Sequence, residues 1–354
     1  MRILITGGAG FVGSSLALCF KEDNPKSHIV VFDNLKRRGS ELNLARFKKH
    51  SIDFIHGDIR QPADLADIQG DFDVFIEASA EPSVLAGISG SPNYVLQTNL
   101  AGTLHCLEFA RQHTGCFLFL STSRVYSMKP LRELSLTENA TRLTISEQQG
   151  FPGITSRGIS ESFPTNLPRS LYGASKLASE LVVQEYADTY KLKAVINRCG
   201  VIAGPGQFGK VDQGVFTMWV ANHVYGLPLK YIGFGGTGKQ VRDLLHPNDL
   251  YALLKKQLAR VDECSGEIFN VGGGVEGSTS LLELTQLCQK ASGRSVTIGA
   301  VPETTPVDIP LYISDSQKVM DRFDWQPQRN VEEIVRNIFT WLQQNKDELR
   351  QIFS

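Results

Sequence analysis

Short, continuous apolar runs recur through the first two hundred residues and alternate with longer stretches whose apolar positions repeat at helical spacing. Continuous runs of about 4–8 residues are typical of strands buried on both faces of a parallel sheet, whereas the longer repeats predict helices. The alternation predicts an α/β fold with a doubly wound parallel sheet. The predicted strands are 2–6, 28–33, 52–56, 72–78, 116–121 and 194–198, and the predicted helices are 11–21, 41–50, 94–112 and 172–190.

The pattern changes in the second half of the chain. Residues 128–169 are polar, contain several prolines and show little periodicity, so we expect a long loop region beside the carboxyl edge of the sheet. Later helix and strand patterns at 214–225, 229–232, 281–291 and 331–345 predict a smaller α/β domain. We place the first domain at residues 1–195 and the second mainly at 196–354, with a segment near 235–260 returning to the first.

Composition narrows the functional classes. The 354 residues are 42% apolar and 21% charged, as in a globular protein with one large or two ordinary domains. Because the formal net charge is -1 and no block of like charges occurs, we expect a small molecule as partner, with no nucleic acid and no membrane. The amino-terminal MRILITGG predicts a strand rather than a signal peptide, and no apolar run reaches the ~18 residues of a membrane helix.

The cysteines indicate the cellular compartment. The chain has 6 cysteines, far apart and mostly within apolar runs, with no C-x-x-C spacing and no Cys/His grouping. Such cysteines are typical of reduced core residues, because free cysteine is mostly buried and the cytosol keeps thiols reduced. We therefore expect a cytoplasmic protein without a metal site.

The strongest chemical motif is GGAGFVG at residues 7–13, which follows the first predicted strand and opens the first helix. Its missing side chains allow a tight turn, close approach of a pyrophosphate to backbone N–H groups, and close packing of helix on strand. Asp33, 20 residues past Gly13, ends the second strand, where a carboxylate binds an adenosine ribose and repels a 2′-phosphate. The motif predicts NAD rather than NADP. Lys36, Arg37 and Arg38 could instead accept a phosphate, but we interpret them as solvated surface charge.

Topology extends the expected coenzyme site to the ends of later strands. Asp58 and Ile59 follow the third strand, where adenine would be met, and residues 78–80 follow the fourth, where they would flank the coenzyme. The coenzyme-binding residues that we expect, before any catalytic group, are Gly7, Gly10, Phe11, Val12, Gly13, Asp33, Asn34, Asp58, Ile59, Ala78, Ser79, Ala80 and Asn99.

A second motif, SLYGASK at residues 170–176, places Tyr172 and Lys176 four positions apart at the start of a predicted helix. Residues at this spacing are neighbours on one face of a helix. The pair is weak evidence alone, because tyrosine and lysine fall at this spacing by chance in most proteins of this size. It gains weight from the coenzyme motif that precedes it.

Taken together, GGAGFVG, Asp33, GDIR (57–60), STSRVY (121–126), YGASK and QVRDLLHPNDL (240–250) resemble the extended short-chain dehydrogenase/reductases that modify nucleotide sugars. The likeness spans nearly the whole chain. KVDQGVF (210–216), GTGKQ (236–240) and FNVGGG followed by SLLEL are most similar to the CDP-paratose 2-epimerase (CDP-tyvelose epimerase) branch. The resemblance implies a homodimer that pairs helices 94–112 and 172–190, and a role in lipopolysaccharide O-antigen biosynthesis.

The resemblance also assigns roles to residues. In this family the tyrosine of Y-x-x-x-K is the general base and acid, and the lysine lowers its pKa and holds the nicotinamide ribose; here these are Tyr172 and Lys176. Thr122, at the end of the fifth strand, would bind the reacting sugar oxygen, with Ser121 or Ser123 as alternatives if the register differs by one. The catalytic residues are therefore Thr122, Tyr172 and Lys176, and Tyr172 and Lys176 also bind NAD. The expected substrate-binding residues are Glu81, Ser123, Arg124, Gln207, Gln213 and Arg242.

These roles predict a nucleotide-sugar epimerase. Tyr172 would take the proton of a sugar hydroxyl as hydride moves from the same carbon to NAD⁺; the ketone then turns, and hydride returns to its other face. Our best expectation is inversion at C2 of a CDP-linked dideoxyhexose. A UDP-sugar 4-epimerase, a net reductase, and an idle NAD-binding sensor or scaffold stay open. A 4,6-dehydratase is disfavoured, because Ser123 and Arg124 stand where that class has an Asp-Glu pair.

Two positions depart from the family pattern. Arg242 matches the arginine that binds the substrate diphosphate, unless it is a surface partner of Asp243. The second diphosphate arginine is missing, because Thr305 stands there; Lys210, Arg294 or Arg322 could compensate. Glu77 also stands where a histidine is common in the family. We therefore expect an unusual ligand.

Overall fold

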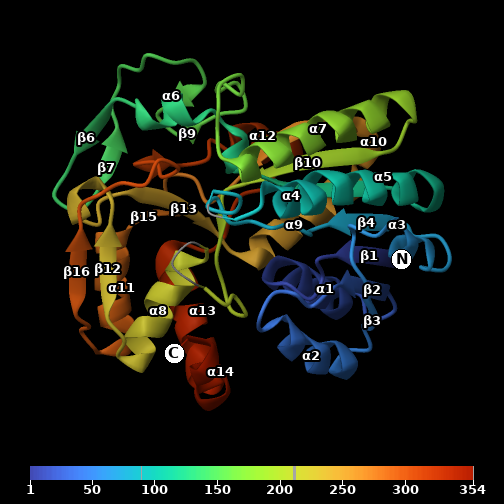
Figure 1. Cartoon of the computed structure of the whole chain (residues 1–354), viewed down its shortest axis with the longest axis horizontal. Helices are drawn as coiled ribbons and strands as arrows, with labels where there is room; N and C mark the ends of the chain where they lie inside the picture. The colour runs from blue at the N-terminus through green and yellow to red at the C-terminus, as the bar shows by residue number, and fades with distance from the viewer. Residues whose placement is uncertain (89, 210–212, 354) are drawn as a thin grey trace.

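The computed structural model describes residues 1–88, 90–209 and 213–353, and its centre is a seven-stranded sheet (Figure 1). The strand order is β14-β10-β5-β4-β1-β2-β3, and every neighbouring pair is parallel, which confirms the predicted fold class. The order reverses between β1 and β4, and sheets of this kind bind ligands beside the carboxyl ends of the strands at that point. The strands are β1 (Arg2–Thr6), β2 (His28–Asp33), β3 (Asp53–His56), β4 (Val74–Glu77), β5 (Phe117–Thr122), β10 (Ala194–Cys199) and β14 (Ile268–Val271).

Helices cover both faces of this sheet, which explains why its strands are apolar throughout. In β1, Ile3 and Ile5 belong to a buried cluster with α1 (Phe11–Asp23) and α9 (Pro247–Ala259). Leu4 points the other way, into a cluster with α5 (Gly102–His113) and α7 (Leu171–Thr189). Figure 1 shows α4 (Pro92–Leu96), α5 and α7 together on one side of the sheet, and α1 with α2 (Asn43–Lys49) on the other. Because α9 and β14 come from the second half of the chain, both halves build this layer.

The helix predicted over 94–112 consists of three segments. α4 (Pro92–Leu96) leads into the π-helical η2 (Gln97–Ala101), which continues as α5. A π turn takes one more residue than an α turn and is frequent at functional sites. Here η2 packs against α7 and turns the buried Asn99 toward that helix.

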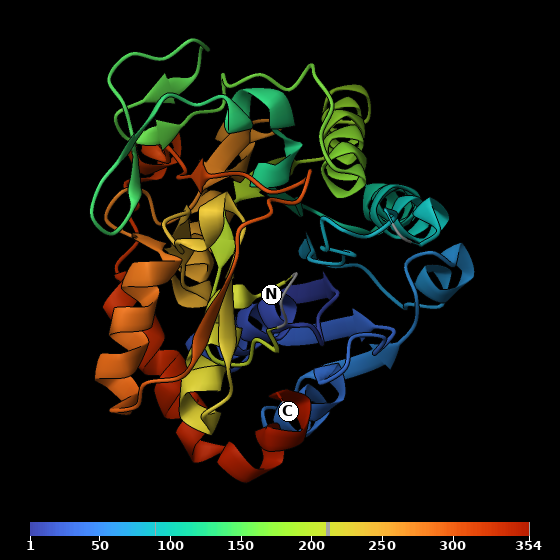
Figure 2. The same ribbon diagram turned by 60° about the vertical axis from the view of Figure 1, so that its left-hand side comes forward.

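The remaining part of the chain forms a smaller unit beside the main sheet. Its strand β13 (Val241–Leu245) pairs with β11, β15 and β17, and a separate parallel pair joins β12 to β16. Its core contains Trp219, Leu244 and Leu284 between helices α8, α11 and α13. Figure 2 shows the carboxyl-terminal α14 at the lower edge of the molecule, after α13. The bounds are β11 (Val201–Ile202), β12 (Leu229–Ile232), β15 (Ser278–Ser280), β16 (Ile298–Val301), β17 (Leu311–Tyr312), α8 (Val215–Tyr225), α11 (Leu281–Ser292), α13 (Val331–Gln344) and α14 (Lys346–Phe353).

Residues 128–169, expected as a loop region, contain a short helix and two small hairpins. Backbone hydrogen bonds hold this segment to the smaller unit: Ile159 N–H donates to the Ile313 carbonyl at 2.8 Å, and Asp315 N–H donates to the Ile159 carbonyl at 2.9 Å. Strands of two or three residues are too short to show a period, so the hydrophobic pattern could not reveal them. The elements are α6 (Met128–Arg132), β6 (Leu136–Glu138), β7 (Leu143–Ile145), β8 (Ile154–Thr155) and β9 (Gly158–Ile159).

The other short elements are η1 (Ser40–Leu42), α2 (Asn43–Lys49), α3 (Pro62–Ala66), η3 (Ser123–Val125), η4 (Phe234–Gly236), α10 (Val261–Cys264) and α12 (Gln317–Phe323). All six cysteines are unpaired, and five of them are buried, as the sequence predicted. In the part of the chain that the structure describes, no helix combines the length and hydrophobicity needed to cross a bilayer.

Candidate coenzyme and substrate site

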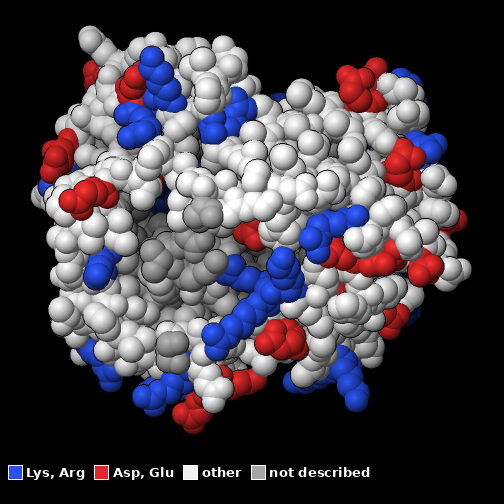
Figure 3. Space-filling model, viewed as in Figure 1, with Lys and Arg blue, Asp and Glu red and all other residues white. Residues whose placement is uncertain are grey.

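A cavity of about 750 Å³ lies along the carboxyl ends of β1, β2, β4 and β5. Its opposite wall includes Gln207, Phe208, Gly209, Gln213 and Gly214, and Figure 3 shows lysine and arginine side chains across the hollow. The structure brings most predicted site residues together here. Those lining the cavity are Gly7, Gly10, Phe11, Val12, Gly13, Asp33, Asn34, Asp58, Ile59, Ala78, Ser79, Ala80, Glu81, Thr122, Tyr172, Gln207 and Gln213.

The turn after β1 leaves no room for side chains. Gly7 has φ +62°, and a Cβ there would lie 2.7 Å from the backbone of Ala78 and Ser79. A Cβ on Gly13 would lie 2.4 Å from the carbonyl oxygen of Gly7. α1 begins after Gly10 without a side-chain cap, so its first backbone N–H groups are available to an anion at the cavity wall.

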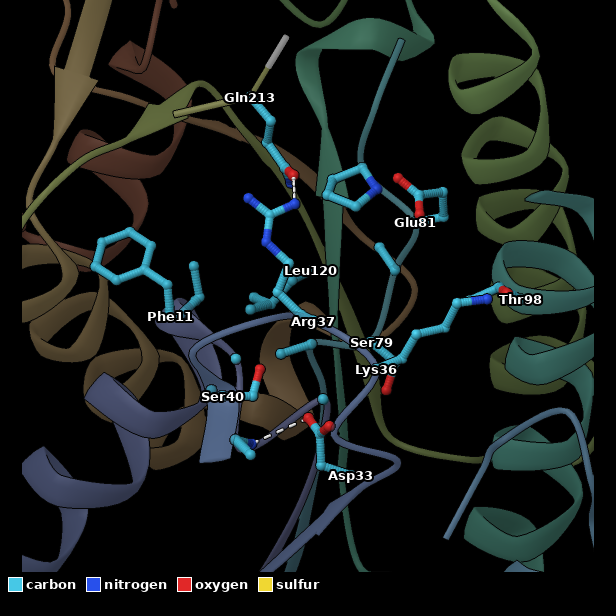
Figure 4. Close-up of a pocket in the computed structure, with 18 of the residues that line it drawn as sticks. Phe11, Asp33, Lys36, Arg37, Ser40, Ser79, Glu81, Thr98, Leu120 and Gln213 are labelled. Carbon is cyan, nitrogen blue, oxygen red and sulfur yellow. Dashed lines mark hydrogen bonds between the residues drawn. The ribbon is translucent and has the colours of Figure 1, made fainter. Parts of the chain in front are cut away.

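Asp33 closes this turn from the end of β2. Its carboxylate accepts hydrogen bonds from the backbone N–H groups of Ala9 (3.1 Å) and Leu35 (2.8 Å). Burial raises the pKa of Asp33, and these donors oppose that effect by stabilising the charged form. Figure 4 shows Asp33 at one end of the cavity, and Glu81 and Gln213 toward the other.

Tyr172 and Lys176 lie one turn apart at the start of α7, as predicted. Ser170 caps this helix by accepting a hydrogen bond from the Gly173 N–H at 3.2 Å. Tyr172 lines the cavity, whereas Lys176 is 1% exposed and lies beneath it. The Lys176 Nζ is 3.8 Å from the centroid of the Phe119 ring, and it has no hydrogen-bond partner among the described residues.

The pKa of Tyr172 differs from the prediction. Burial raises it to about 12, and the nearby Thr122 hydroxyl offsets only part of this rise. Burial also lowers the pKa of Lys176. The protein's own groups therefore keep the phenol protonated at neutral pH, and Tyr172 needs additional positive charge before it can act as a base.

Thr122, rather than Ser121, presents its hydroxyl to Tyr172. Thr122 ends β5 and accepts a hydrogen bond from the Arg124 N–H at 3.2 Å. The Ser121 hydroxyl is committed elsewhere, because it donates to the buried Glu180 carboxylate at 2.5 Å. The arrangement favours the predicted register, with Thr122 next to the tyrosine.

This geometry agrees with a match to the model described as "NAD dependent epimerase/dehydratase family", which covers residues 3–272. The chain belongs to that family. It is 30% identical to CDP-paratose 2-epimerase of Salmonella typhi over 349 residues, which is 96% of this chain and 99% of the relative. It is 28% identical to dTDP-glucose 4,6-dehydratase of an Actinoplanes species over 354 residues, 98% of this chain and 99% of the relative.

A solved structure extends the comparison to three dimensions. DesIV, a dTDP-glucose 4,6-dehydratase from Streptomyces venezuelae, was solved with NAD and TYD bound. It is similar to this chain with a TM-score of 0.78 and 28% identity, covering 99% of this chain and 100% of DesIV. NAD is the coenzyme of this epimerase/dehydratase family, as predicted. The tight glycine turn, the uncapped α1 and Asp33 fit a dinucleotide, since they offer close backbone approach, N–H donors and a ribose partner.

Of the basic residues after β2, Lys36 and Arg38 are exposed, as expected, and Arg37 is partly buried. Lys36 Nζ lies 3.6 Å from the centroid of the Tyr94 ring. Arg37 donates to the Gln213 side chain and, at 2.9 Å, to the Phe208 carbonyl. Arg38 donates to the Gln351 carbonyl on α14 at 2.5 Å. These contacts join the segment after β2 to the facing segments. Lys36 and Arg38 are nevertheless exposed, which agrees with the surface interpretation, whereas Arg37 is partly buried and does not fit it.

Arg242 and Arg124 lie outside the cavity lining and near each other. Arg242 donates to the Asp308 carboxylate at 3.0 Å and to the Ile309 carbonyl at 2.8 Å, so it is not a partner of Asp243. Arg124 donates to the Val307 carbonyl at 3.4 Å, and burial and the nearby Arg242 charge lower the pKa of Arg124 to about 10. Two guanidinium groups therefore share one acidic partner on the 305–309 segment.

The proposed substitutes for the missing arginine at Thr305 are elsewhere. Arg294 donates to the Val224 carbonyl at 3.2 Å, at the end of α8. Arg322 lies 3.5 Å from the Glu267 carboxylate. Lys210 is outside the described residues. Arg124 is thus the described cation that the structure brings close to Arg242.

Asn99 and Ser123 also lie off the cavity. Asn99 is fully buried, and its amide spans from the Glu81 backbone, at 2.8 and 3.1 Å, to the Ser175 hydroxyl at 3.1 Å. It holds the segment after β4 against α7, and its contact with coenzyme stays a prediction. Several lining residues were not predicted, because they come from strands, helices and loops at positions that carry no motif: Tyr94, Thr98, Leu120, Cys199, Phe208 and Ile352.

Proposed function

We propose that this protein is an NAD-dependent nucleotide-sugar epimerase that inverts one sugar carbon through a transient keto-sugar. The observation that carries the proposal is the meeting of Thr122 and Tyr172 at the wall of a cavity that also contains the glycine turn. One wall offers a dinucleotide site, and the other offers a hydroxyl and a phenol in contact. C2 of a CDP-linked dideoxyhexose is the best choice of carbon and substrate, supported by 30% identity to the Salmonella typhi enzyme.

The chain's own residues supply proton transfer and orientation. NAD, when bound, accepts hydride from the sugar carbon and later returns it. The Tyr172 oxygen takes the proton of the sugar hydroxyl and gives it back after the ketone has turned. The Thr122 hydroxyl holds the same sugar oxygen beside the phenol, and the charge on Lys176 favours the phenolate. Tyr172 is buried, and the positive charge of a bound nicotinamide ring would offset the burial that raises its pKa.

Epimerisation is favoured over dehydration by the two residues after Thr122. Elimination of water needs an acid and a base near the sugar, and the chain has Ser123 and Arg124 in sequence there. The Arg124 guanidinium donates to the Val307 carbonyl and lies near the charge of Arg242. Neither Ser123 nor Arg124 therefore supplies the acid and base that elimination needs. We also propose that Arg242, Arg124, Gln207, Gln213, Glu81 and Ser123 bind the substrate, with the two arginines supplying charge for its diphosphate.

The same residues suit inversion at C4, so the test must identify the carbon. Purified protein is incubated with CDP-paratose or with UDP-sugars, and the products are followed by NMR. We expect CDP-paratose to equilibrate with its C2 epimer, and substrate labelled with deuterium at C2 to show the isotope effect. Inversion of a UDP-sugar at C4 would replace the C2 assignment, and release of a 4-keto-6-deoxy sugar would refute epimerisation.

We further propose a cytoplasmic homodimer in which α5 and α7 of two copies pair across a two-fold axis. Both helices carry large apolar side chains on their outer faces: Leu104 on α5 is 37% exposed, and Leu181 on α7 is 58% exposed. Tyr190, at the end of α7, is 53% exposed. Isologous dimers use one self-complementary patch, and a shared apolar helix pair has this property.

A further inference from the structure

A second buried charge lies next to Lys176 and has no part in the proposed chemistry. Glu77 ends β4 and is completely buried. It is the register partner of Phe119 on β5, and the Phe119 ring lies under the Lys176 ammonium. Register partners on neighbouring parallel strands point to the same face. Glu77 therefore lies beside the ring on which Lys176 rests.

Within the described residues, hydrogen bonds do not fully satisfy either charge. Glu77 Oε2 and Lys176 Nζ are both buried without a partner, and only Glu77 Oε1 has one, the Thr103 hydroxyl at 2.9 Å. A buried ion without compensation is costly, so each group depends on the opposite charge of the other. Burial lowers the pKa of Lys176, and Glu77 is the strongest of the groups that raise it.

The other acidic groups around Lys176 are committed or neutral. Glu180, on α7, binds the Arg198 guanidinium at 2.7 Å and the Ser121 hydroxyl at 2.5 Å. Cys106 on α5 and Cys199 on β10 are thiols at neutral pH, because burial raises the pKa of both. Tyr172, on the same helix, stays a phenol for the same reason. Glu77 remains as the negative charge that is free to balance Lys176.

Thr103 can form a hydrogen bond with Glu77 whether Glu77 is ionised or protonated. Its hydroxyl lies 2.9 Å from Glu77 Oε1 and 2.8 Å from the Asn99 carbonyl, yet it has one proton to donate. When Glu77 is ionised, the Thr103 proton binds the carboxylate. When Glu77 is protonated, the acid donates to the Thr103 oxygen, and the Thr103 proton turns to the Asn99 carbonyl. Burial raises the pKa of Glu77 to about 7, and Lys176 opposes this rise, so both states are within reach.

We propose that Glu77 is a positioning residue that keeps Lys176 protonated and holds its ammonium under the coenzyme cavity. Its carboxylate acts through Lys176 and does not touch the sugar. This inference rests on the proposed function in one respect, because it assumes that the charge on Lys176 assists proton transfer by Tyr172. The relation between Glu77 and Lys176 can be measured without turnover.

The test monitors the Lys176 side chain by NMR in protein labelled with ¹³C,¹⁵N-lysine and saturated with NAD. The Lys176 signal is assigned by its loss in Lys176→Met, and its midpoint is measured by pH titration. We expect Glu77→Gln to lower the midpoint by about 1 pH unit, because Glu77 is the strongest of the groups that raise the pKa of Lys176. Thr103→Val, which removes a hydrogen bond but keeps the charge, should shift it much less. An unchanged midpoint in Glu77→Gln overturns the proposal.

Further variants guard against a folding defect. If Glu77→Gln does not fold, Glu77→His is used, because a neutral imidazole of similar size also removes the charge at alkaline pH. Glu77→Asp retains a carboxylate and should restore the midpoint toward the wild-type value; failure to do so counts against the charge pair. In an active enzyme, the alkaline limb of kcat should move to lower pH in Glu77→Gln by the same amount. If Glu77→Gln lowers the titration midpoint of Lys176 in a protein that epimerises no sugar, the positioning role of Glu77 is upheld and the proposed function is rejected.

Discussion

The Asn99 side chain lies 3.1 Å from the Ser175 hydroxyl and joins the π-helical turn η2 to α7, between the two ends of Y-x-x-x-K. The same amide holds the Glu81 backbone, so one residue connects the segment after β4 to the helix that carries Tyr172 and Lys176. The π turn has a physical role here, because it directs an amide inward where a regular helix would place it differently.

Replacing Asn99 by leucine should therefore act on stability and not on coenzyme affinity. The variant leaves the backbone N–H and carbonyl of Glu81 without partners, at about 1–3 kcal/mol for each unsatisfied group, whereas the Ser175 hydroxyl keeps its hydrogen bond to the Tyr172 carbonyl. We expect the free energy of unfolding in urea to fall by about 3 kcal/mol, and NAD affinity per folded molecule to change little. Ser175→Ala, which removes one partner, should cost about 1 kcal/mol. A specific loss of NAD binding at unchanged stability would show that Asn99 contacts the coenzyme after all.

Tyr172→Phe should abolish most turnover while leaving the fold intact. The substitution removes only the hydroxyl that we propose transfers the proton, and general acid–base groups contribute about 10²–10⁴-fold to rate. We expect kcat to fall within this range, with nucleotide affinity retained. The wild-type acid limb, where rate rises with pH as the phenol ionises, should disappear. Tyr126→Phe is the matched control, because this buried tyrosine hydrogen-bonds Asn270 at 2.7 Å and is not at the cavity. Equal losses in both variants would contradict the assignment.

The parts of this molecule that sequence could predict are those encoded by neighbours in the chain. The strand over 28–33, the glycine turn and the Tyr172–Lys176 pair each depend on local periodicity or spacing, and the structure contains them as expected. The contacts of Asn99 could not be predicted, because its partners, Glu81 and Ser175, are distant in sequence and meet only after α7 has packed.

Charge and burial were harder to predict than position. Lys36, Arg37 and Arg38 form a hydrophilic run that is typical of a surface, and only the folded chain brings Tyr94, Phe208 and α14 to them. For the protein alone, burial raises the pKa of Tyr172, and the prediction had considered only the neighbouring positive charges. Spacing indicates which groups are neighbours, whereas a pKa also depends on how much water the fold removes, and burial is the larger effect here.

His246 should make stability fall in mild acid. Its ring is buried and accepts a hydrogen bond from the Asn248 N–H at 3.1 Å, which caps α9 and requires a neutral nitrogen. Burial, with a smaller effect of Arg329, lowers the pKa of His246 from 6.5 to about 4. Because the unfolded chain binds the proton more readily, this contribution to stability is present above pH 6.5 and is lost as pH falls toward 4.

The effect of His246 can be isolated by comparing variants. The lowered pKa of His246 corresponds to a loss of about 2 kcal/mol in the free energy of unfolding between pH 7 and pH 5. In His246→Asn the side chain can still cap the helix and no longer titrates, so we expect its unfolding free energy to decline less than that of wild type over this interval. Urea denaturation at several pH values measures both curves. Parallel curves would mean that His246 is protonated in the folded protein without strain on the cap.

Leu181→Glu should separate the proposed dimer. Leu181 is 58% exposed on α7, and a charge there would be buried at the centre of a helix-pair interface without an opposite charge to balance it. Light scattering should give twice the chain mass of 39.1 kDa for the wild type and the single mass for the variant. Val275→Glu is the control, because Val275 is 46% exposed outside these helices and its charge should leave the mass unchanged. A wild-type protein that stays at the single mass over a wide concentration range would exclude the dimer, and the apolar face of α5 and α7 would then need another partner.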